Sequence, residues 1–136
     1  MTIEPQGILH FTIGVTDLDR ASDFYQNVVG CKLVRVNKKN TMAFMSAGND
    51  YFVLTNTGRH VRPNDDGDTV FHHSFIVKPE DYDHAVSFVE SHDIETMVPI
   101  GKLDQHNTFP GRHIYFYDPD GNGVEITECT GPAAGL

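Results

Sequence analysis

Two histidines and one glutamate of this chain have the types and positions of a metal-binding set. His10 and His72 each stand in a segment typical of a β-strand, five residues before the valine that ends it. Glu125 stands in a third segment of this kind, which is largely apolar. Because successive side chains of a strand point to opposite faces, all three are predicted to point away from the packed face, into one concavity.

Two imidazoles and one carboxylate can hold a divalent ion on one face and leave its other coordination positions open. A carboxylate buried without a partner is costly, which favours a cation beside Glu125. We therefore predict that His10, His72 and Glu125 bind one divalent metal ion. His73 would replace His72 as the ligand if a bulge shifted the strand by one residue.

The elements that would position these residues occur twice in the sequence. Each half begins with a strand, at residues 8–15 and 71–77, and continues into a helix with a recognisable start. Thr16 or Asp17 can cap the first helix, and Pro79 suits the first turn of the second. Three short strands follow in each half, at residues 32–36, 41–45 and 51–55 and at residues 95–99, 113–117 and 123–128.

This duplication predicts an α+β fold of two tandem β-α-β-β-β modules. Neither module can bury both faces of its sheet alone, so we expect a curved, half-barrel-like mixed sheet with the helices outside. The chain is predicted to be a single domain, with module one at about 7–58, a polar linker at about 59–69, module two at about 70–128 and a C-terminal tail at 129–136. The concave inner face is the expected ligand site.

The composition narrows the classes of partner. The chain has 136 residues and a formal net charge of −9, so nucleic acids and anionic membranes, which require clustered positive charge, are not expected partners. No apolar stretch approaches the roughly 20 residues of a membrane span, and the first residues lack the runs of a signal peptide. The two cysteines do not suggest a disulfide framework. We expect a cytoplasmic protein with a small-molecule substrate.

The sequence resembles the vicinal-oxygen-chelate superfamily, which includes glyoxalase I, bleomycin-resistance proteins, fosfomycin-resistance enzymes and extradiol ring-cleaving dioxygenases. Three segments carry the similarity, at residues 9–15, 72–77 and 111–125. The resemblance implies a metal-dependent enzyme with ligands at His10, His72 and Glu125. Strand edges and apolar surface left by the modules predict a homodimer, and in some relatives the modules are exchanged between chains.

Two members of the superfamily fit the sequence less well. Glyoxalase I-like proteins use two histidines and two glutamates, but the first-half equivalent of Glu125 falls at Phe52 or Val53, neither of which can bind a metal. Fosfomycin-resistance enzymes must hold a phosphonate, which calls for several Arg or Lys side chains. Near the predicted cavity the sequence offers only Lys102 and Arg112.

The extradiol dioxygenases fit better, and the resemblance to them implies Fe(II) and a catechol-like, aromatic substrate. Their signature places a histidine before an apolar residue and a tyrosine, then a turn with Pro and Gly, then the ligand glutamate. Here these positions are His106, Ile114-Tyr115, Asp118-Pro119, Gly121 and Glu125. Tyr115 and His106 would then be catalytic, with Tyr115 donating to a bound oxygen and His106 to an oxygen of the substrate.

Other functions of the same fold and metal site remain as alternatives. One is a glyoxalase-like lyase, isomerase or thiol transferase that uses manganese, nickel or zinc. Another is a non-catalytic, bleomycin-type binder of aromatic drugs. The segment 101–112, with its two glycines and one proline, is expected to be a loop that acts as a lid and carries His106.

Overall fold

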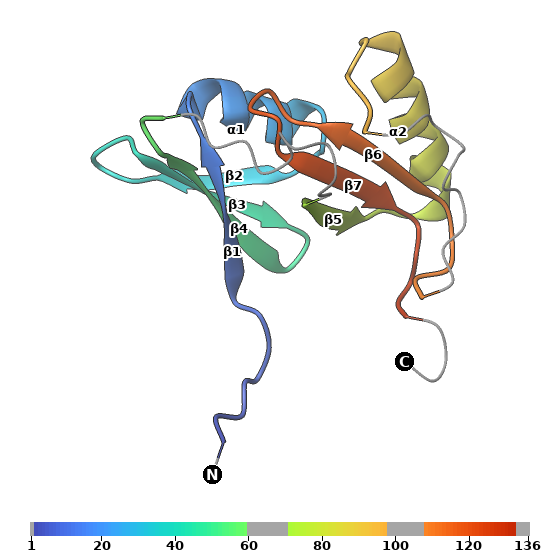
Figure 1. The fold of residues 1–136 in the computed structure, drawn as a ribbon, viewed down its shortest axis with the longest axis horizontal. Coiled ribbons are helices and arrows are strands. Elements are labelled where there is room, and N and C mark those ends of the chain that lie inside the picture. The colour runs from blue at the N-terminus through green and yellow to red at the C-terminus, as the bar shows by residue number, and fades with distance from the viewer. Residues whose placement is uncertain (1, 60–70, 98–107, 133–136) are drawn as a thin grey trace. The chain divides into compact units, whose positions relative to one another are not determined.

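The structure is a computed structural model that describes residues 2–59, 71–97 and 108–132 (Figure 1). The chain divides into two compact units, residues 1–61 and 62–136, which we call module one and module two. Each unit contains one of the helices and one of the sheets found in the described residues. Neither helix has the length and apolar character that crossing a membrane requires.

Module one is a four-stranded mixed sheet with one helix. Its elements in chain order are β1 (His10–Val15), α1 (Leu18–Asn27), β2 (Lys32–Val36), β3 (Met42–Ala47) and β4 (Asp50–Asn56). The strand order is β1-β4-β3-β2, in which β1 is parallel to β4 and the other neighbours are antiparallel. The helix begins after Asp17, whose side chain caps it by accepting a hydrogen bond from the backbone N–H of Arg20 at 3.0 Å.

The core of module one lies where α1 packs on the sheet. Ile13 and Val15 of β1 are buried, whereas His10, on the alternate positions, is exposed. Tyr25 of α1 is fully buried, and its ring lies edge-on to that of Phe52 in β4 with the centroids 5.5 Å apart. The predicted alternation of the first strand is therefore confirmed, because its apolar positions face the core and His10 does not.

In its described residues, module two is a three-stranded mixed sheet with one helix. Its elements are β5 (His72–Ile76), α2 (Pro79–Ser91), β6 (His113–Tyr117) and β7 (Gly123–Thr127). The strand order is β5-β7-β6, in which β7 runs parallel to β5 and antiparallel to β6. All five residues of the central strand β7 are buried. Side chains on either face of β7 are therefore removed from water.

The predicted fold class is confirmed, since the chain is α+β with two mixed sheets of four and three strands. Only part of one expected element lies within the described residues. The strand expected at residues 95–99 is present, in the described part of that segment, only as a bridge between Thr96 and Phe116. Two backbone hydrogen bonds join it to β6, from Met97 to Tyr115 and from Tyr117 to Glu95, both 3.0 Å long. Residues 98 and 99 of the expected strand lie outside the described residues.

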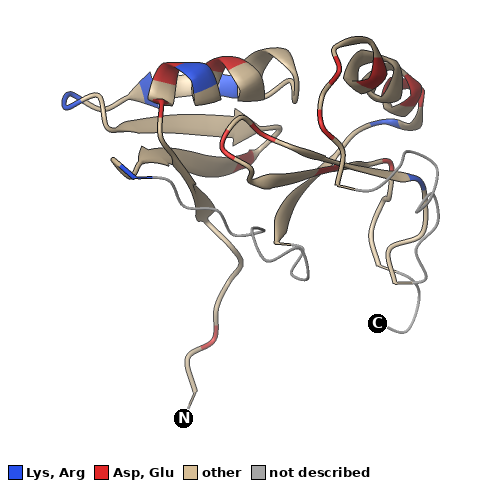
Figure 2. Cartoon of the chain, turned by 45° about the horizontal axis from the view of Figure 1, so that its top comes forward, with Lys and Arg blue, Asp and Glu red and all other residues tan. Residues whose placement is uncertain are grey.

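Charge is distributed unevenly over the helices (Figure 2). The helix α2 carries acidic side chains and no Lys or Arg, whereas α1 carries Asp19, Arg20 and Asp23. Two of the acidic residues of α2, Glu80 and Asp81, stand in the first turn, where the helix dipole favours negative charge. A third, Asp83, contacts the arginine described below.

Gly123 allows β5 and β7 to approach closely beside His72. The two residues are partners in the parallel register. A Cβ atom on Gly123 would lie 2.4 Å from the backbone carbonyl oxygen of Phe71 and 2.9 Å from the Cβ of His72. Any side chain at this position would therefore displace the backbone that carries His72.

Gly123→Ala should destabilise module two, because the new methyl group meets backbone that cannot yield. We expect urea denaturation to give a free energy of unfolding lower by about 1 to 3 kcal/mol, the usual range for overpacking. Gly14→Ala in β1 is the matched control, since its Cβ would meet only the side-chain methyl group of Thr57, at 3.0 Å. Equal losses in the two variants would contradict this reason for the glycine.

Candidate functional site

A cavity of about 550 Å³ lies on the sheet of module two. All three strands contribute polar side chains to its lining, namely His72, Ser74, His113, Tyr115, Glu125 and Thr127. Apolar atoms form most of the remaining wall, which includes Ile76, Phe109 and Cys129. No Lys or Arg is found among the described residues that line it. An apolar hollow with a few converging polar groups is typical of small-molecule sites.

Glu125 is the buried centre of these polar groups. Only 6% of the residue is exposed, and each carboxylate oxygen has a histidine partner. Oε2 lies 3.0 Å from Nε2 of His72, and Oε1 is hydrogen-bonded to Nδ1 of His113. These histidines stand on β5 and β6, the two neighbours of β7. The carboxylate is therefore held from both sides.

Opposing effects set the pKa of Glu125. Burial raises the pKa, but hydrogen bonds from His72 and His113, together with the charges of these rings, oppose it and leave the pKa of Glu125 below its ordinary value. At neutral pH Glu125 is therefore an ionised carboxylate. This is the form of the side chain that binds metal ions.

Tyr115 lies opposite Glu125 in the register of β6 and β7 and lines the same cavity. Its ring lies edge-on to that of His72, with the centroids 5.3 Å apart. Burial, the negative charge of Glu125 and a hydrogen bond with that residue raise the pKa of Tyr115 to about 12. The hydroxyl group is therefore protonated at neutral pH and acts as a hydrogen-bond donor.

His10 lies in module one, where it lines a second cavity, of about 390 Å³. The registers of the parallel pairs show that it corresponds to His72. His10 pairs with Tyr51 of β4, and His72 pairs with Gly123 of β7. Two positions further along these strands stand Val53 and Glu125. Of the two candidates, Val53 is thus the first-half equivalent of Glu125, and module one has no carboxylate at that place.

Three of the residues predicted from the sequence, His72, Tyr115 and Glu125, lie together in module two. It is His72, and not the neighbouring His73, that contacts Glu125. His73 is half-buried, and burial followed by the charge of His72 lowers its pKa. His106 lies outside the described residues, as do Lys102 and the first part of the expected lid.

His113 has no role in the sequence-based prediction, although it is a direct partner of Glu125. It stands two residues before Tyr115 on β6, and this alternation places it on the cavity face. That spacing is the signal that could have identified it. Its contact with Glu125 joins residues 12 positions apart and depends on the pairing of two strands.

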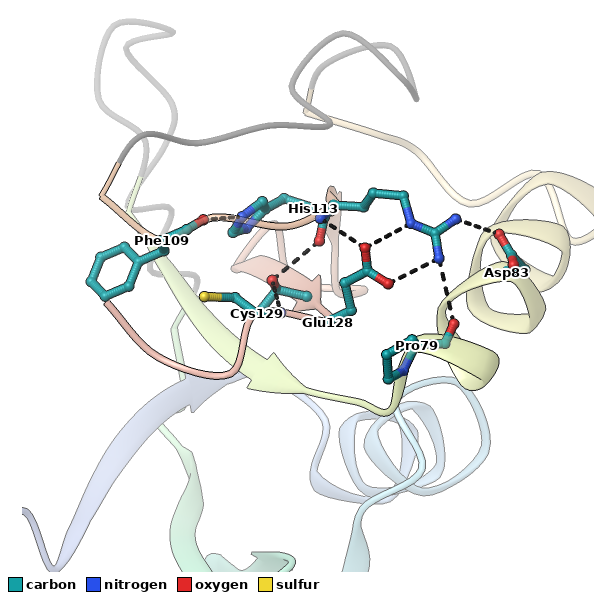
Figure 3. Close-up of polar contacts among 8 residues, drawn as sticks. Pro79, Asp83, Phe109, His113, Glu128 and Cys129 are labelled. Atoms are coloured by element: carbon teal, nitrogen blue, oxygen red, sulfur yellow. Dashed lines mark hydrogen bonds and ion pairs between the residues drawn. The ribbon is translucent and has the colours of Figure 1, made fainter. Parts of the chain in front are cut away.

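A separate network at the end of β7 holds Arg112 (Figure 3). Its Nε and Nη2 donate to the two carboxylate oxygens of Glu128 at 2.8 and 2.9 Å, and its Nη1 donates to Asp83 of α2 at 2.7 Å. The guanidinium group also lies over the ring of Tyr82, 4.4 Å from its centroid. Bidentate pairing of this kind fixes an arginine in place. Arg112 therefore ties α2 to the end of β7, and its guanidinium group is engaged by two carboxylates.

The comparisons with known proteins identify the family. The model of the Glyoxalase/Bleomycin resistance protein/Dioxygenase superfamily matches residues 7–126, which cover most of both modules. The chain belongs to this superfamily. The resemblance found in the sequence motifs is therefore confirmed.

Several similar proteins are named for fosfomycin resistance or thiol transfer. The metallothiol transferase FosB of Lysinibacillus sphaericus is 28% identical over 123 residues, which are 89% of this chain and 81% of the relative. The glutathione transferase FosA of Serratia marcescens is 29% identical over 122 residues, 89% of this chain and 79% of the relative. The fosfomycin resistance protein FosX of Listeria monocytogenes has a similar fold, with a TM-score of 0.74 at 21% identity over 93% of this chain and 94% of that one. A mutant form of that protein was solved with Mn(II) and 1S,2S-dihydroxypropylphosphonic acid.

These relatives confirm the prediction of a metal-dependent enzyme at the level of class. They favour thiol transfer, one of the alternatives left by the sequence, over ring cleavage. They give no support to the dioxygenase, to Fe(II) or to an aromatic substrate.

Part of the dioxygenase signature has a structural role, because the Asp118 side chain accepts hydrogen bonds from the backbone of Asp120 and Asn122 at 2.9 and 2.8 Å. These residues build the turn before β7 and carry no information about the substrate.

The ion pair of Arg112 and Glu128 should make stability depend on pH. The side-chain hydrogen bond from Arg112 holds the pKa of Glu128 below its ordinary value. Such a carboxylate stabilises the fold above its ordinary pKa, and this contribution is lost as the pH falls through the folded-state pKa. We expect urea denaturation to show that the free energy of unfolding of the wild type falls between about pH 5 and pH 3. For Glu128→Gln this fall should be smaller. The difference between the two proteins should be modest, because the ion pair borders solvent. Parallel pH profiles would show that the pair contributes nothing.

Proposed function

We propose that this chain is a metal-dependent transferase that adds a thiol to a small electrophilic substrate. His10, His72 and Glu125 would hold one divalent ion, for which Mn(II) is the first candidate. The observation that carries the proposal is the pair of donor atoms in module two, Nε2 of His72 and Oε2 of Glu125, 3.0 Å apart on the cavity wall. The thiol and glutathione transferases among the relatives support the type of reaction.

The donor pair fits an octahedral divalent ion. Two ligand atoms at right angles, each about 2.1 Å from an ion, are about 3.0 Å apart. The distance between His72 Nε2 and Glu125 Oε2 has this value. Imidazole and carboxylate donors suit ions such as manganese, nickel and zinc rather than soft ions that prefer sulfur.

The third ligand in this proposal comes from module one. Within the ranges that the structure describes, no three His, Cys, Asp or Glu side chains are assembled into a metal-binding group. His10 is the candidate because it corresponds to His72 in the register of the parallel strands. The proposed ligand set has one histidine from each module and a carboxylate from module two alone, because module one has Val53 at the place of Glu125.

The residues around the donor pair can bind and orient a substrate. A divalent ion there would supply Lewis-acid polarisation of a substrate oxygen. Tyr115 places a protonated hydroxyl group beside Glu125, and Ser74 and Thr127 offer neutral hydrogen-bonding groups. Ile76 and Phe109 line the same cavity and offer apolar contacts to a substrate.

An epoxide is the simplest electrophile for the proposed reaction. The thiolate sulfur forms a bond to one ring carbon, the bond between that carbon and the ring oxygen breaks, and the released oxygen takes a proton. Fosfomycin is the first epoxide to test, because FosX, which has a similar fold, is a fosfomycin resistance protein. No Lys or Arg stands on the described cavity wall of module two, so an uncharged epoxide is the second.

Removal of either donor in module two should abolish tight metal binding. Titration with Mn(II), followed by the electron paramagnetic resonance signal of the free ion, should show one ion bound per wild-type chain. We expect His72→Ala and Glu125→Gln to weaken binding by on the order of 100-fold or more, because each removes a ligand. His92→Ala, at the exposed C-terminal end of α2, is the matched control and should bind as the wild type does. Unchanged affinity in Glu125→Gln would exclude the proposed site, and unchanged affinity in His10→Ala would remove module one from it.

The reaction is tested by the mass of its product. Wild-type protein incubated with Mn(II), glutathione and each epoxide should form an adduct whose mass is the sum of the two substrates. The metal-free protein and Glu125→Gln should form it no faster than buffer does. A product containing water in place of glutathione would contradict thiol transfer, and no product with either epoxide would contradict the proposed substrate class.

A further inference from the structure

We propose that His113 is a positioning residue for the metal centre, which holds the Glu125 carboxylate so that Oε2 faces His72. The inference rests on the proposed function, because it assigns His113 to the support of a ligand. His113 contributes no atom to the reaction and acts only through Glu125.

Both nitrogens of the His113 ring are engaged by oxygen atoms. Nδ1 is hydrogen-bonded to Oε1 of Glu125, and Nε2 donates to the backbone carbonyl oxygen of Phe109 at 2.7 Å. A carbonyl oxygen can only accept, which places a hydrogen on Nε2. The hydrogen bond between Nδ1 and Oε1 holds a second proton. The ring therefore connects the backbone at Phe109 to the carboxylate.

The surroundings of His113 keep the ring in this one orientation. The residue is 3% exposed, so no solvent can replace either partner at low cost. The ring of Tyr115 stacks beside it, with the centroids 6.3 Å apart and the planes 12° apart. Between Phe109 and His113, Gly111 has a φ of +125°, a backbone conformation that favours glycine. The turn and the stacked ring together fix the direction in which Nδ1 points.

The fixed ring determines which oxygen of Glu125 is presented to an ion. With Oε1 held by His113, the oxygen that faces His72 is Oε2, at 3.0 Å. Hydrogen bonds to ligating carboxylates orient them and raise metal affinity. A carboxylate held in advance also loses less conformational freedom when the ion binds. Since each ring nitrogen of His113 faces an oxygen, neither is directed at the place of the ion.

Two amide substitutions separate the two contacts of His113. The side-chain amide of His113→Asn reaches about as far as Nδ1 and can still donate to Glu125, whereas that of His113→Gln reaches about as far as Nε2 and retains only the contact with Phe109. In the Mn(II) titration, we expect His113→Gln to weaken binding by about 10- to 100-fold and His113→Asn to stay within about threefold of the wild type. His92→Gln is the control. A purely structural role would affect thermal stability in both variants without this difference in affinity.

The outcomes distinguish this inference from the proposed function. Wild-type binding of Mn(II) together with equal affinities of His113→Gln and His113→Asn would overturn the role of His113 alone. Absence of Mn(II) binding by the wild type would overturn both proposals.

A measurement on the unchanged protein covers the case in which the variants fail to fold. The proton between Nδ1 of His113 and Glu125 should give a strongly downfield resonance in proton NMR of histidine-labelled protein. We expect it to persist when Zn(II), which is diamagnetic, saturates the site. Loss of the resonance on addition of Zn(II) would show that the ion displaces His113 from the carboxylate, and would overturn the inference.

Discussion

The burial of one negative charge, that of Glu125, is the constraint on which the rest of module two depends. A carboxylate removed from water is unstable unless charges or hydrogen bonds compensate it. His72 and His113 compensate it from the two strands that flank β7. Both strands must therefore keep their register, and Gly123 permits the close approach of β5 that this requires. The packing of the sheet and the chemistry of the cavity depend on the same contacts.

The arginine of module two is kept away from this carboxylate. Arg112 is paired with Glu128 and Asp83 at the end of the sheet, next to the acidic helix α2. Within the described lining of the cavity, imidazole rings are thus the only basic side chains near Glu125. A guanidinium group cannot bind a metal ion, whereas a neutral imidazole can. The separation of the two networks leaves the carboxylate with partners that a divalent ion can share.

The two modules share a strand register but differ in chemistry. Val53 occupies in module one the place that Glu125 occupies in module two, and it is buried like its counterpart. A buried valine needs no polar partner, so module one can keep its histidine exposed at the edge of a mainly apolar cavity. At this equivalent position module one offers a valine and module two a carboxylate, so the two cavities differ in chemistry.

The local patterns of the sequence determined the strand faces, the helix start at Thr16 or Asp17 and the turn at Asp118, because each depends on side chains only a few residues apart. The motifs also identified the superfamily, although the residues shared with dioxygenases did not define the reaction. Only the tertiary structure decided which residues hold Glu125 and what Arg112 does. Those contacts join positions 12, 16 and 29 residues apart. They arise from strand pairing and from the burial of β7 on both faces, which are properties of the assembled sheet and not of any local segment.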